Sequence, residues 1–320
     1  IYNFQSLRAE LEALGHVFRT RSDTEVIVQA WMAWGPACVH RLRGMFAFAI
    51  WDQKQQTLFM ARDRMGVKPL HYALLPDGTL VFGSELKVIT AHPGFERQID
   101  PQAVEDYFAL GYVPDPRCIY RQAHKLPPAH TLTWRRGQAG LPTPQPYWDV
   151  HFTLDNPISL ADAEAELRER VRESVRLRMI ADVPLGAFLS GGVDSSAVVA
   201  TMAGLSKLPV RTCAIGFDDP QFNESAFAQL VADRYHTDHR LEIVQSDDFD
   251  LIDTLARLYD EPFADSSALP TYRVCQMARK HVTVALSGDG GDESLGGYRR
   301  YRMHLGEERA RQSLPLGVRQ

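Results

Sequence analysis

The sequence predicts a two-domain protein in which an α+β domain with antiparallel sheets precedes an α/β domain with a doubly wound parallel sheet. The chain has 320 residues, which exceeds one domain of typical size and suggests two. A proline-rich passage at 141–149 (LPTPQPYWD) has the composition of a linker. Across this passage the pattern changes from short apolar segments separated by turns to helices that alternate with strands. We therefore place the boundary between residues 145 and 146, so the predicted domains are 1–145 and 146–320.

The first domain starts with two predicted helices. Leucines at helical spacing predict a helix over 4–14, and a second helix over 23–34 can begin with either Ser22 or Asp23 as its N-cap. Short apolar segments follow and predict strands over 45–51, 57–61 and 79–83. Short strands joined by tight turns favour antiparallel pairing, so we expect an α+β domain.

The second domain alternates helices and strands along most of its length. The predicted helices cover 161–179, 195–205, 224–235, 249–258 and 269–280. The predicted strands are an apolar strand that ends at Leu189 and strands over 210–217, 241–244 and 282–286. This alternation predicts a parallel sheet that is covered by helices on both faces. Ligands of such sheets bind beyond the carboxyl ends of the strands, and two glycine-rich loops lie at such ends.

Composition and charge argue against several classes of protein. The formal net charge of -5 argues against nucleic-acid binding, because proteins that bind nucleic acid usually carry a strong basic bias. The four cysteines form no C-x-x-C pair, which argues against a zinc site and a disulfide framework. No apolar run is long enough to span a bilayer. We expect a cytoplasmic protein with neither nucleic-acid nor membrane partners, and a homodimer is left open.

The first glycine-rich loop, residues 190–196 (SGGVDSS), joins an apolar strand to a helix. Gly191 and Gly192 let backbone N–H groups approach an anion without a Cβ in the way. The helix that follows adds unpaired N–H groups and the positive end of its dipole. Three serine hydroxyls add further donors: Ser190, Ser195 and Ser196. The pattern predicts a phosphate-binding loop.

Asp194 is a carboxylate inside this predicted anion site, and two interpretations of it stay open. A carboxylate beside phosphates binds Mg²⁺, which neutralises both. Alternatively, the side chain only caps the helix that follows. The loop is not a Walker P-loop, because it lacks Gly-Lys-Ser/Thr. The second loop, 286–293 (LSGDGGDE), is not a dinucleotide fingerprint, because Glu293 stands where the third glycine belongs.

The Ser-Gly-Gly-x-Asp-Ser of residues 190–195, placed after a strand, resembles the signature of the PP-loop ATP pyrophosphatases. The loop 286–293, with the Gly-Gly-Tyr of 296–298 just beyond it, resembles the asparagine synthetase members of that group. Ser294 departs from the family, which commonly has a hydrophobic residue there. The resemblance implies that this part of the chain binds ATP and releases pyrophosphate and AMP.

Individual roles are implied by the same resemblance. Four residues outside the first loop are implied to line the ATP pocket: Leu189, Ile215, Ser287 and Gly288. Asp194 and Asp292 are implied to bind magnesium on the pyrophosphate. Asp289 occupies the acidic position that is associated with forming the aspartyl-adenylate. Residues 260–267 (DEPFADSS) also resemble the family, and the alternative is that these polar residues only cap a helix.

The front half resembles class II glutamine amidotransferase domains, which have an Ntn-type fold. The resemblance rests on 1–4 (IYNF), 22–25 (SDTE), 42–48 (LRGMFAF), 61–70 (ARDRMGVKPL) and 82–85 (FGSE). In that family an amino-terminal cysteine attacks the side-chain amide of glutamine, and its own α-amino group is the base. Residue 1 of this chain is isoleucine. Asp23 matches the aspartate that recognises the α-ammonium of glutamine, and its alternative role is to cap a helix.

Together the two resemblances cover nearly the whole chain and predict an ATP-dependent amide ligase, a glutamine-dependent asparagine synthetase. Its implied substrates are glutamine, aspartate and ATP. The chain begins without methionine and stops just after a polar helical stretch, so we expect a fragment cut at both ends. Three alternatives stay open: a β-lactam synthetase-like enzyme, an amidotransferase acting on another carboxylate, and a non-catalytic ATP-binding homologue.

Overall fold

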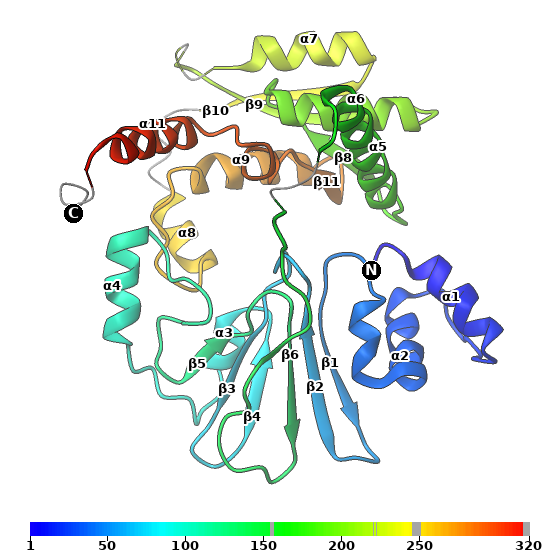
Figure 1. Ribbon diagram of the computed structural model, residues 1–320, viewed down its shortest axis with the longest axis vertical. Helices are drawn as coiled ribbons and strands as arrows, with labels where there is room; N and C mark the ends of the chain where they lie inside the picture. The colour runs from blue at the N-terminus through cyan, green and yellow to red at the C-terminus, as the bar shows by residue number, and fades with distance from the viewer. Residues whose placement is uncertain (154–156, 220, 222, 245–250, 316–320) are drawn as a thin grey trace. The chain divides into compact units, whose positions relative to one another are not determined.

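The computed structural model divides the chain into two compact units (Figure 1). The first comprises Ile1–Pro157 and Phe249–Ser266, and the second comprises Ile158–Asp248 and Ser267–Gln320. The structure describes residues 1–153, 157–219, 221, 223–244 and 251–315. Each unit has hydrophobic clusters of its own, and each is described by itself.

The first unit combines helices with short strands. Its helical segments are α1 (Phe4–Ala13), α2 (Asp23–Trp34), the 3₁₀ helix η1 (Gly35–His40), α3 (Leu86–Thr90), α4 (Pro101–Leu110) and α8 (Ile252–Leu258). Its strands are β1 (Ala47–Asp52), β2 (Thr57–Arg62), β3 (His71–Leu74), β4 (Leu80–Gly83), β5 (Ala123–Lys125), β6 (His130–Arg135) and β7 (Gln145–Pro146). They form one sheet of order β1-β2-β6-β7 and another of order β4-β3-β5. The strand pairs are antiparallel, which confirms the predicted α+β fold.

The opening helices of the first unit share a core with its first sheet. α2 buries Val26, Ile27 and Ala30, which lie on one face because residues three and four apart are neighbours on a helix. These side chains cluster with Leu11 of α1 and Phe59 of β2. The predicted helix over 23–34 therefore exists with the predicted bounds, and its apolar face covers the sheet.

Helices and strands alternate in the second unit. Its helices are α5 (Leu160–Arg178), α6 (Val193–Leu205), α7 (Ser225–Tyr235), α9 (Ala268–Arg279), α10 (Gly291–Leu295) and α11 (Arg299–Ser313). Its strands are β8 (Leu185–Phe188), β9 (Arg211–Phe217), β10 (Asp238–Val244) and β11 (Val284–Leu286). They form a parallel sheet, as predicted, and the order of its strands is β10-β9-β8-β11. In the part of the chain that the structure describes, no helix is both long enough and apolar enough to cross a membrane.

Side chains along β9 show that helices cover both faces of this sheet. Ala214 packs in a cluster with Val199 of α6 and Ala228 of α7. Its neighbour Cys213 packs in a second cluster with Met277 of α9. Successive side chains of a strand point to opposite faces, so α6 and α7 cover one face and α9 covers the other. This confirms the doubly wound arrangement.

The two units divide the chain at other places than the predicted domains do. The first unit continues to Pro157, past the predicted boundary between 145 and 146, and it also contains the segment Phe249–Ser266. Helix α8 lies in this segment and corresponds to the helix predicted over 249–258, of which residues 249 and 250 lie outside the described residues. The division into 1–145 and 146–320 stays a prediction.

Candidate active site

Two glycine-rich loops leave the same edge of the parallel sheet. β8 ends at Phe188 and β11 ends at Leu286, and these strands are parallel neighbours in which Leu286 pairs with Ala187. The loops over 189–192 and 287–290 therefore begin side by side, at the carboxyl ends of adjacent strands. This is the edge at which open parallel sheets bind ligands.

Contact between the two loops depends on glycine. A Cβ placed on Gly288 would lie 2.7 Å from the backbone nitrogen of Ser195 and 2.9 Å from the Cβ of Asp194. A Cβ placed on Gly291 would lie 2.5 Å from Oδ2 of Asp194 and 2.8 Å from Oδ1. The atom that Gly288 approaches belongs to the backbone, so this position needs a residue without a Cβ, whereas a Cβ at Gly291 would force the Asp194 carboxylate to turn away. The structure thus brings Asp194 of the first loop directly against the second loop. The contact is at Gly291, the residue that precedes Asp292.

The first loop is held in shape by its own hydroxyls. The Ser190 and Ser195 hydroxyl oxygens are 3.0 Å apart, and the Ser195 hydroxyl donates to the Gly192 carbonyl at 3.2 Å. The N–H of Gly192 donates to the Ser190 hydroxyl at 3.3 Å. Gly191 has a φ of +85°, and a Cβ there would lie 2.6 Å from the backbone nitrogen of Ala228 in α7. Two of the three serine hydroxyls assigned to an anion are therefore engaged inside the loop.

The start of α6 presents N–H groups that no side chain caps. The N-cap is Gly192, and it provides no side-chain hydrogen bond to the first turn. Asp194 lies within that turn, and the capping interpretation of Asp194 is therefore not supported. Ser196 is half-buried, and its N–H donates to the Gly192 carbonyl at 3.0 Å. The uncapped N–H groups and the dipole of this helix favour an anion at its start.

The carboxylates assigned to metal binding and catalysis lie on or beside these loops. Asp289 is exposed, and its Oδ2 accepts a hydrogen bond from the Ser287 hydroxyl at 2.9 Å. Asp194 and Asp292 are half-buried. Among the described residues, no group of three or more His, Cys, Asp or Glu side chains is placed to hold a metal ion. A pair of carboxylates does fit Mg²⁺, which commonly takes one or two protein carboxylates and completes its shell with water and substrate phosphates.

The turn beyond Asp292 contains the departure from the family pattern. The Tyr298 hydroxyl donates to Glu293 at 2.6 Å, and this hydrogen bond lowers the pKa of the Glu293 carboxyl. The N–H of Gly297 donates to the Asp292 carbonyl at 3.0 Å, and a Cβ on Gly297 would collide with the Asp292 carboxylate. Ser294 is exposed in α10. Water can solvate its hydroxyl there, so a polar residue is accommodated at this position.

Two apolar residues assigned to the ATP pocket differ in what they can contribute. Leu189 is 1% exposed, and its side chain packs in the hydrophobic cluster that contains Val199 and Ala214. Its side chain is therefore occupied by packing, so a contact of ATP with Leu189 would use backbone atoms, and the implied role stays a prediction. Its N–H already donates to the Cys213 carbonyl at 2.9 Å. Ile215 is half-buried on β9.

A second site lies in the first unit, around Asp23. A cavity of about 400 Å³ is lined by residues of α2 and by β1 with the residues just before it. Ser22 is the N-cap of α2 and accepts from the N–H of Thr24 at 3.1 Å, so Asp23 is not the cap. Asp23 is half-buried, and it lines this cavity. A carboxylate in the wall of a cavity can accept charge-assisted hydrogen bonds from the α-ammonium of an amino acid.

Asp63 is a functional candidate that the sequence did not single out. It is 1% exposed, and its carboxylate accepts from the N–H groups of Phe46, Val67 and Lys68 at 3.1, 2.9 and 2.9 Å. Phe46 and Lys68 line the cavity beside Asp23. An aspartate often binds N–H groups of the turn that follows it, so Asp-x-x-Gly at 63–66 was the signal for this role.

Comparisons with known proteins match both halves of the chain. Residues 1–148 match the glutamine amidotransferase domain family, and residues 166–320 match the asparagine synthase family. The chain is 40% identical over 313 residues to putative asparagine synthetase (glutamine-hydrolyzing) 2 of Methanocaldococcus jannaschii, covering 93% of this chain and 57% of that protein. It is 36% identical over 310 residues to asparagine synthetase (glutamine-hydrolyzing) 1 of Bacillus subtilis, covering 95% and 48%.

A further relative has another name. The chain is 29% identical over 323 residues to amidase chry2 of Gibberella zeae, covering 94% of this chain and 47% of that protein. The chain spans about half the length of the curated relatives it matches. The matched families agree with the two sites, because one unit contains the cavity at Asp23 and the other contains the paired glycine loops.

Proposed function

Because the chain belongs to the family that joins a glutamine amidotransferase domain to an asparagine synthase domain, we propose that it is part of a glutamine-dependent asparagine synthetase. The proposed enzyme makes the side-chain amide of asparagine from aspartate, ATP and ammonia taken from glutamine. The observation that carries the proposal is the contact of Gly288 and Gly291 with Asp194, because it joins the two loop motifs in one site.

In the second unit, the proposed reaction activates the aspartate side chain. An oxygen of that carboxylate attacks the α-phosphorus of ATP, the bond from this phosphorus to the bridging oxygen breaks, and pyrophosphate leaves. Asp289 is proposed to act while this aspartyl-adenylate forms, and ammonia then displaces AMP to give asparagine. The uncapped N–H groups at the start of α6 support the proposal, because preorganised donors stabilise charge on a transferring phosphoryl group.

Asp194 and Asp292 are the residues that would hold magnesium. When bound, the ion would supply positive charge to the pyrophosphate oxygens. Asp194 is held against Gly288 and Gly291, and the carboxylate of Asp292 is held against Gly297. Two carboxylates beside a polyphosphate repel it unless a cation lies between them, so the donor set favours a divalent ion together with the nucleotide.

In the first unit, Asp23 is proposed to recognise the α-ammonium of glutamine. Its carboxylate is not used as a helix cap, and it lines a cavity of about 400 Å³. Hydrolysis of the glutamine side-chain amide supplies the ammonia in this proposal. Asp63 supports the cavity, because it holds the backbone of Phe46 and Lys68 in its wall.

The direct test supplies the protein with ATP, Mg²⁺, aspartate and ammonium chloride and measures asparagine, AMP and pyrophosphate. Equal amounts of the three products are expected. Asp194→Ala and Asp292→Ala are each expected to abolish AMP release, whereas Asp233→Ala, which removes an exposed carboxylate of α7, is expected to leave it unchanged. A folded protein that binds no ATP in the presence of Mg²⁺ would contradict the proposal and favour the non-catalytic homologue.

A second candidate changes only the carboxylate that is activated. The relative named amidase chry2 favours it, since the chain matches that protein over 94% of its own length. The candidate includes a β-lactam synthetase-like enzyme and an amidotransferase for another acid. Binding of ATP without AMP release from aspartate, followed by AMP release with a different carboxylate, would support this candidate and leave the adenylation chemistry standing.

A further inference from the structure

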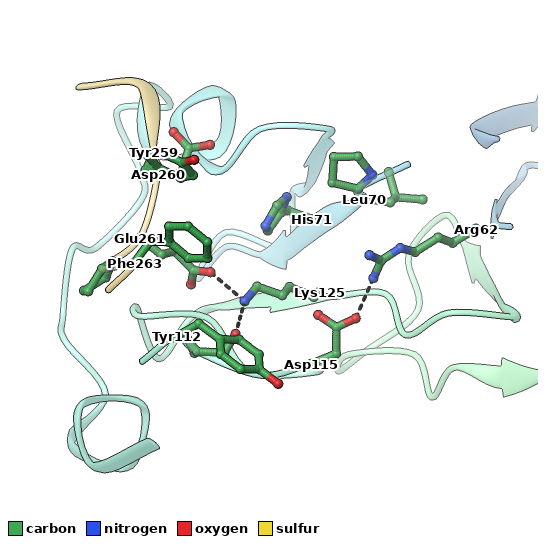
Figure 2. Close-up of a pocket in the computed structure, with 13 residues that line it drawn as sticks. Arg62, Leu70, His71, Tyr112, Asp115, Lys125, Tyr259, Asp260, Glu261 and Phe263 are labelled. Carbon is green, nitrogen blue, oxygen red and sulfur yellow. Dashed lines mark hydrogen bonds and ion pairs between the residues drawn. The ribbon is translucent and has the colours of Figure 1, made fainter. Parts of the chain in front are cut away.

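Residues 259–264 lie within the sequence range that matches the asparagine synthase family, but in the structure they are part of the first unit. Residues 166–320 form that match, whereas Phe249–Ser266 is part of the unit that contains Ile1–Pro157. The stretch forms one wall of a cavity of about 280 Å³ (Figure 2). Neither glycine loop lines this cavity, so it is separate from the site proposed for ATP.

Glu261 is paired inside this cavity. Its Oε2 is 2.5 Å from Nζ of Lys125, and its Oε1 accepts from the N–H of Ile119 at 2.6 Å. Figure 2 shows Lys125 reaching toward Glu261, and its Nζ also donates to the carbonyl of Val113 at 2.5 Å. The Glu261 and Lys125 side chains are 14% and 13% exposed. A pair so well shielded from water differs from an incidental surface ion pair, because separating it would leave a charge in poorly solvated surroundings.

Asp260 caps helix α3 from a distant part of the chain. α3 begins at Leu86, and its own N-cap, Glu85, makes no side-chain cap hydrogen bond. Oδ2 of Asp260 accepts from the N–H of Leu86 at 2.6 Å, across 174 residues of sequence, and Oδ1 is 3.3 Å from Nζ of Lys87. The side chain that caps a helix normally comes from the residue just before it. Asp260 thus provides a hydrogen-bond acceptor for the first N–H of a helix in the amidotransferase half.

One further contact joins the end of this stretch to the rest of the first unit, and another joins two of its own side chains. The N–H of Ala264 donates to the Gly111 carbonyl at 2.8 Å. The rings of Tyr259 and Phe263 stack with their centroids 4.8 Å apart and their planes 16° apart. The N-cap of α9 is Ser267, which makes no side-chain cap hydrogen bond. The alternative that these polar residues only cap the following helix is therefore not supported.

We propose that residues 259–264 are a docking peptide, and that the surface of the first unit around Leu86, Ile119 and Lys125 is its receptor. Two adjacent carboxylates, flanked by a stacked aromatic pair, meet two backbone N–H groups and two lysine side chains. The peptide leads within a few residues into α9, and its receptor helix α3 follows within two residues of Ser84, which lines the cavity at Asp23. The docking fastens a segment of the synthase half to the amidotransferase half, whatever carboxylate the enzyme activates.

The test is hydrogen exchange at the Leu86 and Ile119 amides of the whole chain, followed by NMR. Both amides are expected to be protected in the wild type. Asp260→Ala should speed exchange at Leu86, and Glu261→Ala should speed exchange at Ile119, each on the order of tenfold or more, because each removes a hydrogen bond to a charged acceptor. Asp253→Ala removes an exposed carboxylate of α8 and should change neither rate.

Conservative variants separate docking from a general loss of structure. Asp260→Asn and Glu261→Gln each keep an acceptor oxygen, so they should retain more protection than the alanine variants. Equal exchange at both amides in the wild type and the alanine variants would overturn the proposal. If an alanine variant does not fold, Lys125→Glu combined with Glu261→Lys decides: a double variant no more stable than Lys125→Glu alone would also overturn it.

Discussion

At the scale of single residues, the proposed site of the second unit depends on glycines, which have no side chain. Gly288 and Gly291 have no Cβ, and this allows Asp194 to lie against the second loop. Serine hydroxyls that could have faced a ligand instead hold the first loop in shape. The proposed site is therefore built from backbone N–H groups and carboxylates, which suits a phosphate and its cation.

Gly288→Ala tests this contact between the loops. The new Cβ would lie 2.7 Å from the Ser195 nitrogen, so the loops must separate. We expect the free energy of unfolding to fall by about 1–3 kcal/mol, as for other overpacked sites, and ATP binding to be lost. Urea denaturation and titration calorimetry measure the two effects. Gly204→Ala in α6 is the control, because a Cβ placed there would have nothing within 4 Å and stability should rise by about 0.5–1 kcal/mol. Equal behaviour of the two variants would contradict the geometry.

Because His71 is buried, we expect the free energy of unfolding to fall in mild acid. Burial lowers its pKa from the usual 6.5, although the nearby carboxylate of Glu261 opposes this shift. Since the unfolded chain then binds a proton more readily than the folded chain, the free energy of unfolding is greatest above pH 6.5 and falls as the pH drops through and below that value. His71→Gln should show a weaker pH dependence between about pH 8 and about pH 5, measured by urea denaturation. His124, whose pKa burial also lowers, should leave a residual slope.

For secondary-structure elements, the first unit is held together by side chains that satisfy backbone groups. Asp63 binds N–H groups just before β1 and in the turn after β2. Asp260 does the same for α3. In both cases a buried or half-buried carboxylate replaces hydrogen bonds that regular structure cannot supply at its ends.

Asp63→Ala should destabilise the first unit and open the cavity at Asp23. The variant leaves the N–H groups of Phe46, Val67 and Lys68 without their acceptor, and we expect the free energy of unfolding to fall by about 2–4 kcal/mol. The measurement is urea denaturation followed by tryptophan fluorescence. The matched control is Asp77→Ala, because Asp77 accepts from the Thr79 N–H at 2.9 Å in an exposed turn. A loss for Asp63→Ala as small as that of the control would contradict the assigned role.

For the whole molecule, two sets of hydrophobic clusters support the two proposed sites. α1, α2 and β2 share one cluster of the first unit, whereas α6 and α7 share a cluster with the parallel sheet of the second. The tryptophans all fall in the first unit, within Ile1–Pro157: Trp31, Trp34, Trp51, Trp134 and Trp148. Their fluorescence therefore reports on that unit, while circular dichroism reports on the helices of both.

ATP with Mg²⁺ should stabilise the second unit more than the first. A ligand that binds only the folded form adds about 2.7 kcal/mol when its concentration is one hundred times its Kd. We expect thermal unfolding followed by circular dichroism to shift upward more than unfolding followed by tryptophan fluorescence. Asp194→Ala should remove the shift. Equal shifts by both probes would mean that the units unfold together, and would contradict the prediction.

Much of the fold was recoverable from short stretches of sequence. The helix over 23–34 was predicted with its bounds, because an N-cap serine and an apolar face mark it locally. Strands β8 and β9 were predicted from apolar runs. Strands β3 (HYAL) and β5 (AHK) were not predicted, because histidine and lysine interrupt these short segments and leave no apolar run to recognise. Their place in a sheet depends on partners elsewhere in the chain.

The chemistry of the site divides in the same way. Periodicity and short motifs are local, so the sequence was sufficient for the two fold classes, and it marked the glycine-rich loop that is proposed to bind phosphate and the carboxylates beside it. Only the tertiary structure showed that Gly291 contacts Asp194, that the side chain of Leu189 is buried, and that Asp260 caps α3. These contacts join residues far apart in sequence. Their energy comes from packing and desolvation in the assembled chain, and no local pattern of residues records it.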